Sequence, residues 1–293
     1  MSAALEIILG GLFHAAVLFM VAAGLQLVFG VQKIVNLACG SFYALGAYVG
    51  ISAVTWAATL GVPKLLLLPV LLLGGLAAAA VGPPIERLLR TVYDRDESFQ
   101  LLLTFALLLI FQDVFRIVWG ANPQTYGTLY LAYGTLDLGV VKAPVYNLLV
   151  IAAAIGTAAG LGWFLQKTDF GRMVRATAEN RAMAEAIGID IRRVFSIVFT
   201  LGVALGTAGG ALVVPSAAAT LDMSVEVVVE AFAVVVIGGL GSMPGAIVGA
   251  AIVGLMRAAA ITFYPEFEML AIYAIVIGVL MLRPAGLFGK EAV

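Results

Sequence analysis

The sequence predicts an all-α polytopic membrane protein. Of its 293 residues, 63% are hydrophobic and only 11% are charged, and the mean hydropathy is +1.11. A soluble domain is about half apolar and a quarter charged. Apolar runs that are long enough to cross a bilayer, about 20 residues each, recur along the whole chain. The densest group of charges lies in residues 167–193. We therefore expect a single transmembrane domain over residues 1–293.

About nine apolar runs define the expected helices, with eight to ten possible. The first run resembles a signal peptide only in being apolar, because no Lys or Arg precedes Lys33 and a signal peptide begins with a basic region. It is therefore predicted to be a retained transmembrane helix. The expected spans are residues 7–30, 40–58, 64–82, 98–119, 144–166, 194–215, 226–240, 244–263 and 267–283.

Three polar or glycine-rich stretches separate some of these runs. Residues 83–97 contain two prolines and several charges and are predicted to form a turn. Residues 120–143 form a polar connection. Residues 238–245 read Gly-Gly-Leu-Gly-Ser-Met-Pro-Gly, a composition that disfavours a continuous helix. The seventh and eighth spans are therefore either full crossings or broken, re-entrant segments.

Basic residues predict the orientation, because the cytoplasmic loops of membrane proteins are enriched in Lys and Arg. If residues 167–193 lie inside and the spans alternate, only Lys64, Arg116 and Lys142 fall at the outer side. The N-terminus is then outside and the C-terminus is cytoplasmic. The basic residues that share the inner side are Lys33, Arg87, Arg90, Arg95, Lys167, Arg172, Arg175, Arg181, Arg192, Arg193, Arg283 and Lys290.

Several classes of function are disfavoured by composition. A net charge of −1 argues against nucleic-acid binding. Cys39 is the single cysteine and His14 the single histidine, so we expect no disulfide and no metal site. No Gly-x4-Gly-Lys-Ser/Thr motif occurs, so the chain is not expected to hydrolyse ATP. No span carries a plausible catalytic cluster, and we expect no enzyme activity.

Few ionisable residues lie within the predicted spans. A charge in the hydrocarbon layer is costly, so an ionisable residue there suggests a function. The simpler expectation for each residue here is that it pairs with another charge or reaches toward the membrane interface. A carrier driven by protons or sodium needs several facing carboxylates, which the spans lack. The ionisable residues concerned are His14, Asp113, Arg116, Glu230 and Arg257.

The charged segment 167–193 has helical spacing between residues 171 and 187. Met173, Ala176, Met183 and Ile187 supply apolar positions, and Gly188 is a good helix stop. The pattern predicts a short amphipathic helix or a pair of helices at the cytoplasmic face. It fits both a solvated loop that obeys the positive-inside rule and a docking surface for a soluble partner.

The glycines of 238–245 and of the following span also allow two interpretations. Small residues let helices approach closely in lipid, so ordinary tight packing explains them. Irregular backbone at membrane depth is tolerated only beside protein or water, so the same break can line or gate a path through the bundle.

Several motifs together resemble one family. Residues 171–176 read Gly-Arg-Met-Val-Arg-Ala, and residues 179–189 read Glu-Asn-Arg-Ala-Met-Ala-Glu-Ala-Ile-Gly-Ile. The most specific run, 231–246, reads Ala-Phe-Ala-Val-Val-Val-Ile-Gly-Gly-Leu-Gly-Ser-Met-Pro-Gly-Ala. Residues 36–40 read Asn-Leu-Ala-Cys-Gly. The chain resembles the permease subunits of ABC transporters of the branched-chain amino acid class over roughly residues 8–288.

The resemblance implies a permease subunit of an ATP-driven importer in a bacterial or archaeal inner membrane. It would translocate branched-chain or related hydrophobic amino acids by alternating access and bind no cofactor, while partner subunits use ATP. The implied partners are two cytoplasmic ATP-binding subunits, a second permease subunit and an extracytoplasmic solute-binding protein. The residues expected to couple to the ATP-binding subunits are Arg172, Arg175, Glu179, Arg181, Glu185 and Gly188. The residues assigned to the path or gate are Asn36, Gly40, Gly238, Gly239, Gly241, Ser242, Pro244 and Gly245.

Two positions depart from the family pattern. Cys39 stands where a histidine is usual, and Glu230 stands where a lysine is common, which reverses a charge near the outer mouth. Permeases for urea, short amides and aromatic or carboxylic acids look alike at this level. They remain alternatives, together with a secondary carrier that works alone.

Overall fold

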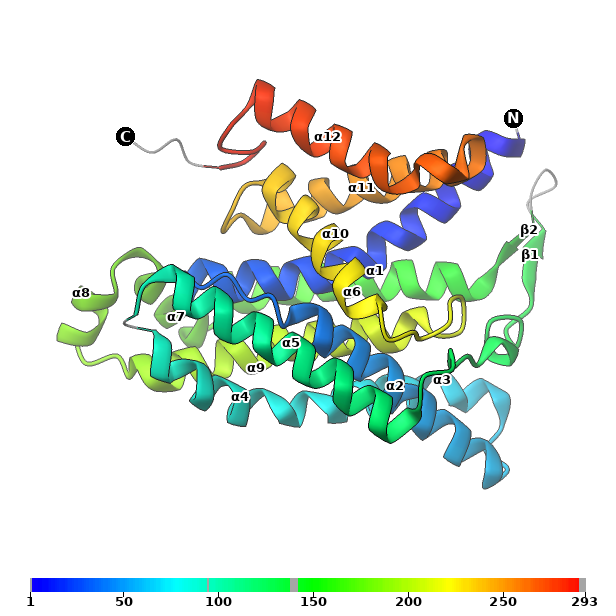
Figure 1. Cartoon of the computed structure of the whole chain (residues 1–293), viewed down its shortest axis with the longest axis horizontal. Helices are drawn as coiled ribbons and strands as arrows, with labels where there is room; N and C mark the ends of the chain where they lie inside the picture. The colour runs from blue at the N-terminus through cyan, green and yellow to red at the C-terminus, as the bar shows by residue number, and fades with distance from the viewer. Residues whose placement is uncertain (1, 94, 138–141, 290–293) are drawn as a thin grey trace.

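The computed structural model describes residues 2–93, 95–137 and 142–289, which form a bundle of helices with one small hairpin (Figure 1). The helices follow the apolar runs, because only a helix satisfies its own backbone hydrogen bonds within a bilayer. Their bounds are α1 Ser2–Gln32, α2 Cys39–Thr59, α3 Leu67–Ala78, α4 Gly82–Leu89, α5 Glu97–Trp119, α6 Val145–Lys167, α7 Asp169–Glu179, α8 Arg181–Ala186, α9 Ile191–Val213, α10 Met223–Gly238, α11 Met243–Phe263 and α12 Glu268–Leu282.

Each of the nine predicted spans coincides with a helical stretch. In the described ranges, seven stretches are long and apolar enough to cross a membrane, among them Lys64–Val92. The predicted spans 226–240 and 267–283 correspond to α10 and α12, which have 16 and 15 residues. The prediction of an all-α polytopic membrane protein is therefore confirmed. Two of the helices are too short to cross at full length.

The prediction of a turn over residues 83–97 was wrong for most of that segment. After α3, the short 3-10 helices Ala79–Val81 and Arg90–Val92 flank α4 and keep the chain helical as far as Val92. Pro83 and Pro84 lie in the first turn of α4. A proline is tolerated there because its missing N–H has no partner at a helix start. The connection to α5 is therefore much shorter than predicted.

Helices α1 and α9 form the centre of the bundle. In both helices, 67% of the most apolar 18-residue stretch is buried. In α6 the buried share of the corresponding stretch is 11%, so α6 is the peripheral helix of the three. A helix that is apolar on all of its sides is typical of such a buried position. Gly24 of α1 meets Gly202 of α9, where an added Cβ would come within 2.5 Å of the Gly202 carbonyl oxygen. The two backbones thus pack directly against each other.

Two helices begin inside the bundle rather than at its edge (Figure 1). Residues 33–38 connect α1 to α2 without a helix. The start of α2 then packs on the start of α10, where a Cβ on Gly40 would lie 1.9 Å from the Ser224 carbonyl oxygen. Only glycine fits at position 40. Helix α10 is short because it begins inside the bundle.

The predicted inner segments gather at one end of the molecule. That end holds α7, α8 and the turn between α10 and α11, while the N-terminus and the hairpin of β1 (Thr135–Asp137) and β2 (Lys142–Pro144) lie at the other (Figure 1). The two strands pair antiparallel, with Leu136 opposite Ala143. The assignment of the α7–α8 end to the cytoplasm stays a prediction from the basic residues.

Candidate functional site

The charged segment forms a pair of helices, the second of the two predicted forms. Helix α7 starts at Thr168, whose hydroxyl accepts a hydrogen bond of 3.0 Å from the Gly171 N–H. Helix α8 starts at Asn180, whose side-chain oxygen accepts one of 3.0 Å from the Met183 N–H. Both are standard helix N-caps. Gly188 has a φ of +91°, so it ends the pair in a conformation that favours glycine.

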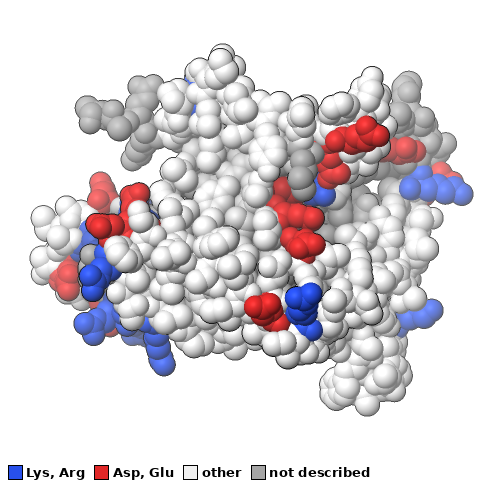
Figure 2. All heavy atoms as spheres, viewed as in Figure 1, with Lys and Arg blue, Asp and Glu red and all other residues white. Residues whose placement is uncertain are grey.

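One face of the α7–α8 pair is buried and the other is exposed. Val174 and Ala184 pack into a cluster with Phe195 at the start of α9. On the opposite side, Met183 is 61% and Ile187 is 68% exposed, so apolar side chains project beyond the bundle. The six predicted coupling residues share this exposure: Arg172, Arg175, Glu179, Arg181, Glu185 and Gly188. Figure 2 shows basic and acidic side chains gathered at this end.

Side-chain contacts attach the pair to the bundle. The Arg175 guanidinium donates a hydrogen bond to the Leu165 carbonyl near the end of α6. The Arg181 guanidinium lies 5.4 Å from the centre of the Phe195 ring, a distance that suits a cation–π contact. The pair is thus anchored both to the end of α6 and to the start of α9.

A buried polar network, which we call the Glu86 network, lies next to Phe195. The Tyr93 ring packs edge-on against the Phe195 ring at 5.5 Å between centres. The Tyr93 hydroxyl lies 3.1 Å from Glu86 Oε1 and 3.4 Å from Gln32 Oε1. Glu86 is fully buried and accepts two hydrogen bonds from Arg90, of 3.2 and 2.5 Å. Through Arg90 and Tyr93, the network therefore links α4 and the 3-10 helix Arg90–Val92 to α1 at Gln32 and to α9 at Phe195.

Tyr93 acts as a donor in this network. Burial, and then the neighbouring Glu86 carboxylate, raise the pKa of the Tyr93 phenol above its ordinary value. The phenol therefore keeps its proton at physiological pH. The network was not predicted from the sequence, although Glu86 and Arg90 stand at the i, i+4 spacing that permits an ion pair on a helix.

The glycine-rich break 238–245 holds the last residue of α10, a tight turn over residues 239–242 and the first three residues of α11. Gly238 and Gly245 face each other so closely that a Cβ on Gly245 would lie 2.1 Å from the Gly238 carbonyl oxygen. The Ser242 hydroxyl caps α11 by accepting a hydrogen bond of 3.1 Å from the Gly245 N–H, and Pro244 lies in the first turn. Gly239 and Gly241 have φ values of +95° and +81°.

Two segments from elsewhere in the chain hold this turn. Gln26 of α1 is buried, donates a hydrogen bond of 2.9 Å to the Gly239 carbonyl and accepts one from the Gly241 N–H. Near the C-terminus, the Leu287 N–H donates to the Ile237 carbonyl at 2.8 Å, and the Phe288 N–H donates to the Gly238 carbonyl at 3.0 Å. A lone glutamine in an apolar span was the only sequence signal for Gln26.

Replacing Gln26 by leucine is expected to lower the free energy of unfolding by about 2 kcal/mol. The change removes both hydrogen bonds and leaves two buried backbone groups of the turn without partners. Thermal unfolding in detergent measures the effect. Gln166 at the end of α6 is exposed, so Gln166→Leu is a matched control that should leave the midpoint unchanged. Equal midpoints for the two variants would contradict the role of Gln26.

The remaining predicted path residues lie apart from this turn. Asn36 is buried in the α1–α2 connection, where its side-chain oxygen accepts a hydrogen bond of 3.0 Å from the Ala38 N–H. Gly40 packs against Ser224 at the opposite end of α10 from Gly238. The structure thus brings six of the eight path residues into one turn and leaves these two elsewhere.

The ionisable residues of the later helices pair as expected. Arg257 Nη1 lies 2.7 Å from Glu230 Oε1, and Arg257 Nε lies 2.6 Å from Glu268 Oε1. One guanidinium on α11 therefore bridges carboxylates on α10 and α12. In the described part of the chain, Asp113 and Arg116 of α5 form no such pair with each other. Within the described residues, no group of three or more His, Cys, Asp or Glu side chains could hold a metal ion.

Comparison with known proteins places the chain in a family. The profile described as the permease component of branched-chain amino acid transport systems matches residues 7–283. The chain belongs to this family. It is thus a permease subunit of an importer, a multi-pass inner-membrane protein and a transport component rather than an enzyme.

Individual relatives are similar over nearly the whole permease. The high-affinity branched-chain amino acid permease protein BraD of Pseudomonas aeruginosa is 25% identical over 99% of this chain and 97% of its own length. A probable branched-chain amino acid permease, LivH of Methanocaldococcus jannaschii, is 29% identical over 96% and 91%. The ribose import permease RbsC of Haemophilus influenzae is 24% identical over 85% and 76%. No solved structure matches the permease significantly.

Family membership implies that the permease works with ATP-binding and solute-binding components. The chain itself supplies the exposed α7–α8 pair, the glycine turn at the same end, and the central α1–α9 contact between them.

Proposed function

We propose that this permease imports branched-chain or related hydrophobic amino acids by alternating access. Its proposed partners are two ATP-binding subunits at the α7–α8 end, a second permease subunit beside it and a solute-binding protein at the other end. ATP is hydrolysed in the partner subunits, and this chain binds no cofactor. The substrate class rests on the relatives BraD and LivH, which are named for branched-chain amino acid transport.

The exposed face of the α7–α8 pair carries the coupling part of the proposal. Met183 and Ile187 are large apolar side chains that project from a charged surface, and exposed apolar groups ringed by polar ones are typical of protein contact sites. An ATP-binding subunit that presses on this face would push on Phe195 through Arg181 and Ala184. Discrete rearrangement of packed helices is the usual way in which such a push is transmitted.

The proposal predicts the effect of removing two charges from this face. In the double variant Arg175→Ala with Glu185→Ala, binding of the ATP-binding subunits is expected to weaken about tenfold, which corresponds to about 1.4 kcal/mol. ATP-dependent uptake into vesicles should fall in parallel. Co-purification of the complex and uptake of labelled leucine measure the two effects.

A matched control lies at the opposite end of the molecule. The double variant Asp113→Ala with Arg116→Ala also removes one acidic and one basic exposed side chain and should leave binding of the ATP-binding subunits unchanged. Unchanged assembly and uptake in the α7–α8 double variant would refute the coupling role. The same vesicles test substrate class with urea, a short amide and benzoate beside leucine. Uptake without any ATP-binding subunit would indicate a carrier that works alone.

A further inference from the structure

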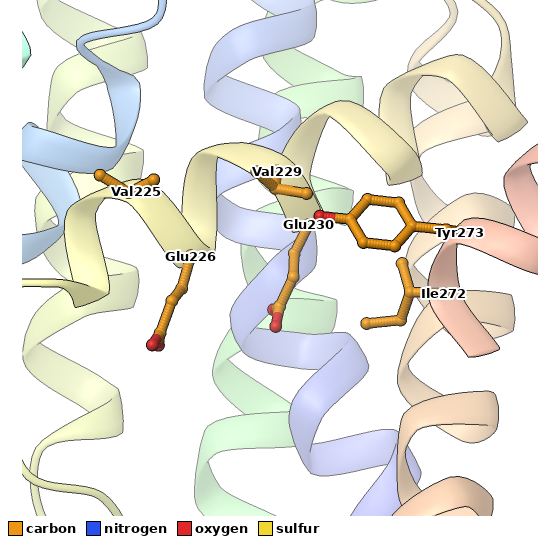
Figure 3. Close-up of a pocket in the computed structure, with 6 residues that line it drawn as sticks. All are labelled: Val225, Glu226, Val229, Glu230, Ile272 and Tyr273. Carbon is orange, nitrogen blue, oxygen red and sulfur yellow. The ribbon is translucent and has the colours of Figure 1, made fainter. Parts of the chain in front are cut away.

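A cavity of about 160 Å³ lies between α10 and α12 (Figure 3). Its walls are mostly apolar, but two carboxylates belong to them. Figure 3 shows Glu226 and Glu230 pointing the same way from α10, and the Tyr273 hydroxyl directed toward that helix. The residues that line the cavity are Val225, Glu226, Val229, Glu230, Ile272 and Tyr273.

The two carboxylates differ in their partners. Glu230 is 7% exposed and bonded to Arg257, whose guanidinium also holds Glu268. The Glu226 carboxylate is exposed, and among the described residues it makes no hydrogen bond or ion pair. Arg257 thus pairs with Glu230 and Glu268 but not with Glu226, so these four ionised side chains together carry two excess negative charges. Acidic side chains gather in a hollow on this face of the molecule (Figure 2).

The position of the exposed Glu226 at the start of α10 makes this excess charge informative. It lies in the first turn of α10, which begins inside the bundle where Ser224 packs on Gly40. An ionised carboxylate beside hydrocarbon is costly, and such residues usually pair with one another or line a pathway. Glu230 has such a partner and Glu226 does not. A positively charged ligand in the cavity would supply it.

We propose that this cavity binds a small organic cation with an apolar body. The ammonium group sits at the Glu226 carboxylate, beside Glu230, and the body packs against Val229, Ile272 and Tyr273. The Tyr273 ring adds an attractive face for a cation. Resting on the proposed function, the cation is the α-ammonium group of a hydrophobic amino acid. Carboxylic acids that lack an amino group are repelled by the excess negative charge.

Two analogues of leucine, one without its carboxylate and one without its amino group, test the charge preference of the cavity. The full chain in lipid nanodiscs is titrated with 3-methylbutylamine, which keeps the ammonium group and the side chain, and with 4-methylpentanoate, which keeps the carboxylate and the side chain. The amine is expected to bind at least tenfold more tightly, because a hydrogen bond to a charged group contributes about that much. Equal binding, or tighter binding of the carboxylate, overturns the proposal.

Variants assign the effect to one residue. Glu226→Gln keeps the shape of the side chain and is expected to weaken amine binding at least tenfold, while Glu226→Asp keeps most of it. Glu266 is exposed on the 3-10 helix Pro265–Phe267 before α12 and does not line the cavity, so Glu266→Gln is the control and should bind the amine normally. Thermal unfolding of each variant verifies that the fold is intact. Unchanged binding by Glu226→Gln overturns the proposal.

Uptake by the complete complex separates this inference from the proposed function. If the complex imports leucine and Glu226→Gln leaves its KM unchanged, the ammonium site is wrong while the proposed function stands. If the complex imports no amino acid but the amine binds in a manner that depends on Glu226, the proposed function is wrong while the cation site stands. A KM that rises at least tenfold in Glu226→Gln, with Glu266→Gln unchanged, supports both.

Discussion

Replacing Arg90 by alanine is expected to lower the free energy of unfolding by about 3 kcal/mol. The Glu86 carboxylate is fully buried, and Arg90 donates two hydrogen bonds to it. Without the guanidinium, only the Tyr93 hydroxyl remains to stabilise a buried negative charge. Breaking such a pair by removing one partner typically costs about 3–5 kcal/mol. The lower end applies because the Arg90 side chain is 35% exposed.

Two further variants make this prediction specific. Arg87 lies next to Glu86 on α4 but is exposed, so Arg87→Ala should have almost no effect on the unfolding midpoint. The double variant Glu86→Gln with Arg90→Ala should recover much of the loss, because no uncompensated charge is left in the interior and the amide still accepts from Tyr93. If Arg90→Ala proves as mild as Arg87→Ala, the Glu86 network does not stabilise the fold.

Replacing Gly46 by alanine is expected to lower the free energy of unfolding by about 3 kcal/mol. Gly46 lies in α2 against α9, and an added Cβ would come within 2.0 Å of the Thr207 carbonyl oxygen and 2.5 Å of its Cα. These are backbone atoms of a central helix, so neither helix can move aside without disturbing the α1–α9 contact. Overpacking of this kind costs about 1–3 kcal/mol and occasionally more. Denaturation in mixed detergent micelles measures the change.

Gly156 provides the matched control. It lies within α6, and a Cβ added there would meet nothing within 4 Å. Gly156→Ala should therefore stabilise the chain slightly, since alanine favours a helix over glycine by about 1 kcal/mol. Opposite signs for the two glycine variants would demonstrate that close packing, rather than helix propensity, governs α2. A neutral Gly46→Ala variant would contradict the direct contact of α2 and α9.

The main elements of the fold were predictable from local sequence patterns. Apolar runs located the helical stretches of all nine predicted spans. A segment must be apolar along its whole length to cross the hydrocarbon layer, whatever its neighbours are. The spacing of residues 171–187 and the stop at Gly188 predicted one helix or a pair where α7 and α8 lie, because capping and amphipathicity act over only a few residues. The prolines at 83 and 84 misled the prediction, because a proline in the first helical turn looks the same as one in a loop.

The polar contacts that hold the bundle were not predictable. Gln26 bonds to Gly239 and Gly241, and Gln32 to Phe195, across more than 160 positions of sequence. A single sequence carries no signal for such pairs, since either partner alone reads as an isolated polar residue in an apolar run. The pairing of Glu230 with Arg257 was expected in general terms, but Glu268 as the second carboxylate was not. The assignment of Gly40 and Gly238 to one path remains a prediction.

The hydrogen bonds from residues 287 and 288 to the end of α10 have a consequence for biosynthesis. Their acceptors, the carbonyls of Ile237 and Gly238, leave the ribosome about fifty residues before the donors do. These two carbonyls therefore lack these partners until the C-terminal segment has been translated. A reporter fused after residue 289 would lie beside the turn between α10 and α11. The way in which the reporter is attached, as well as its size, would therefore affect how well the newly made chain folds.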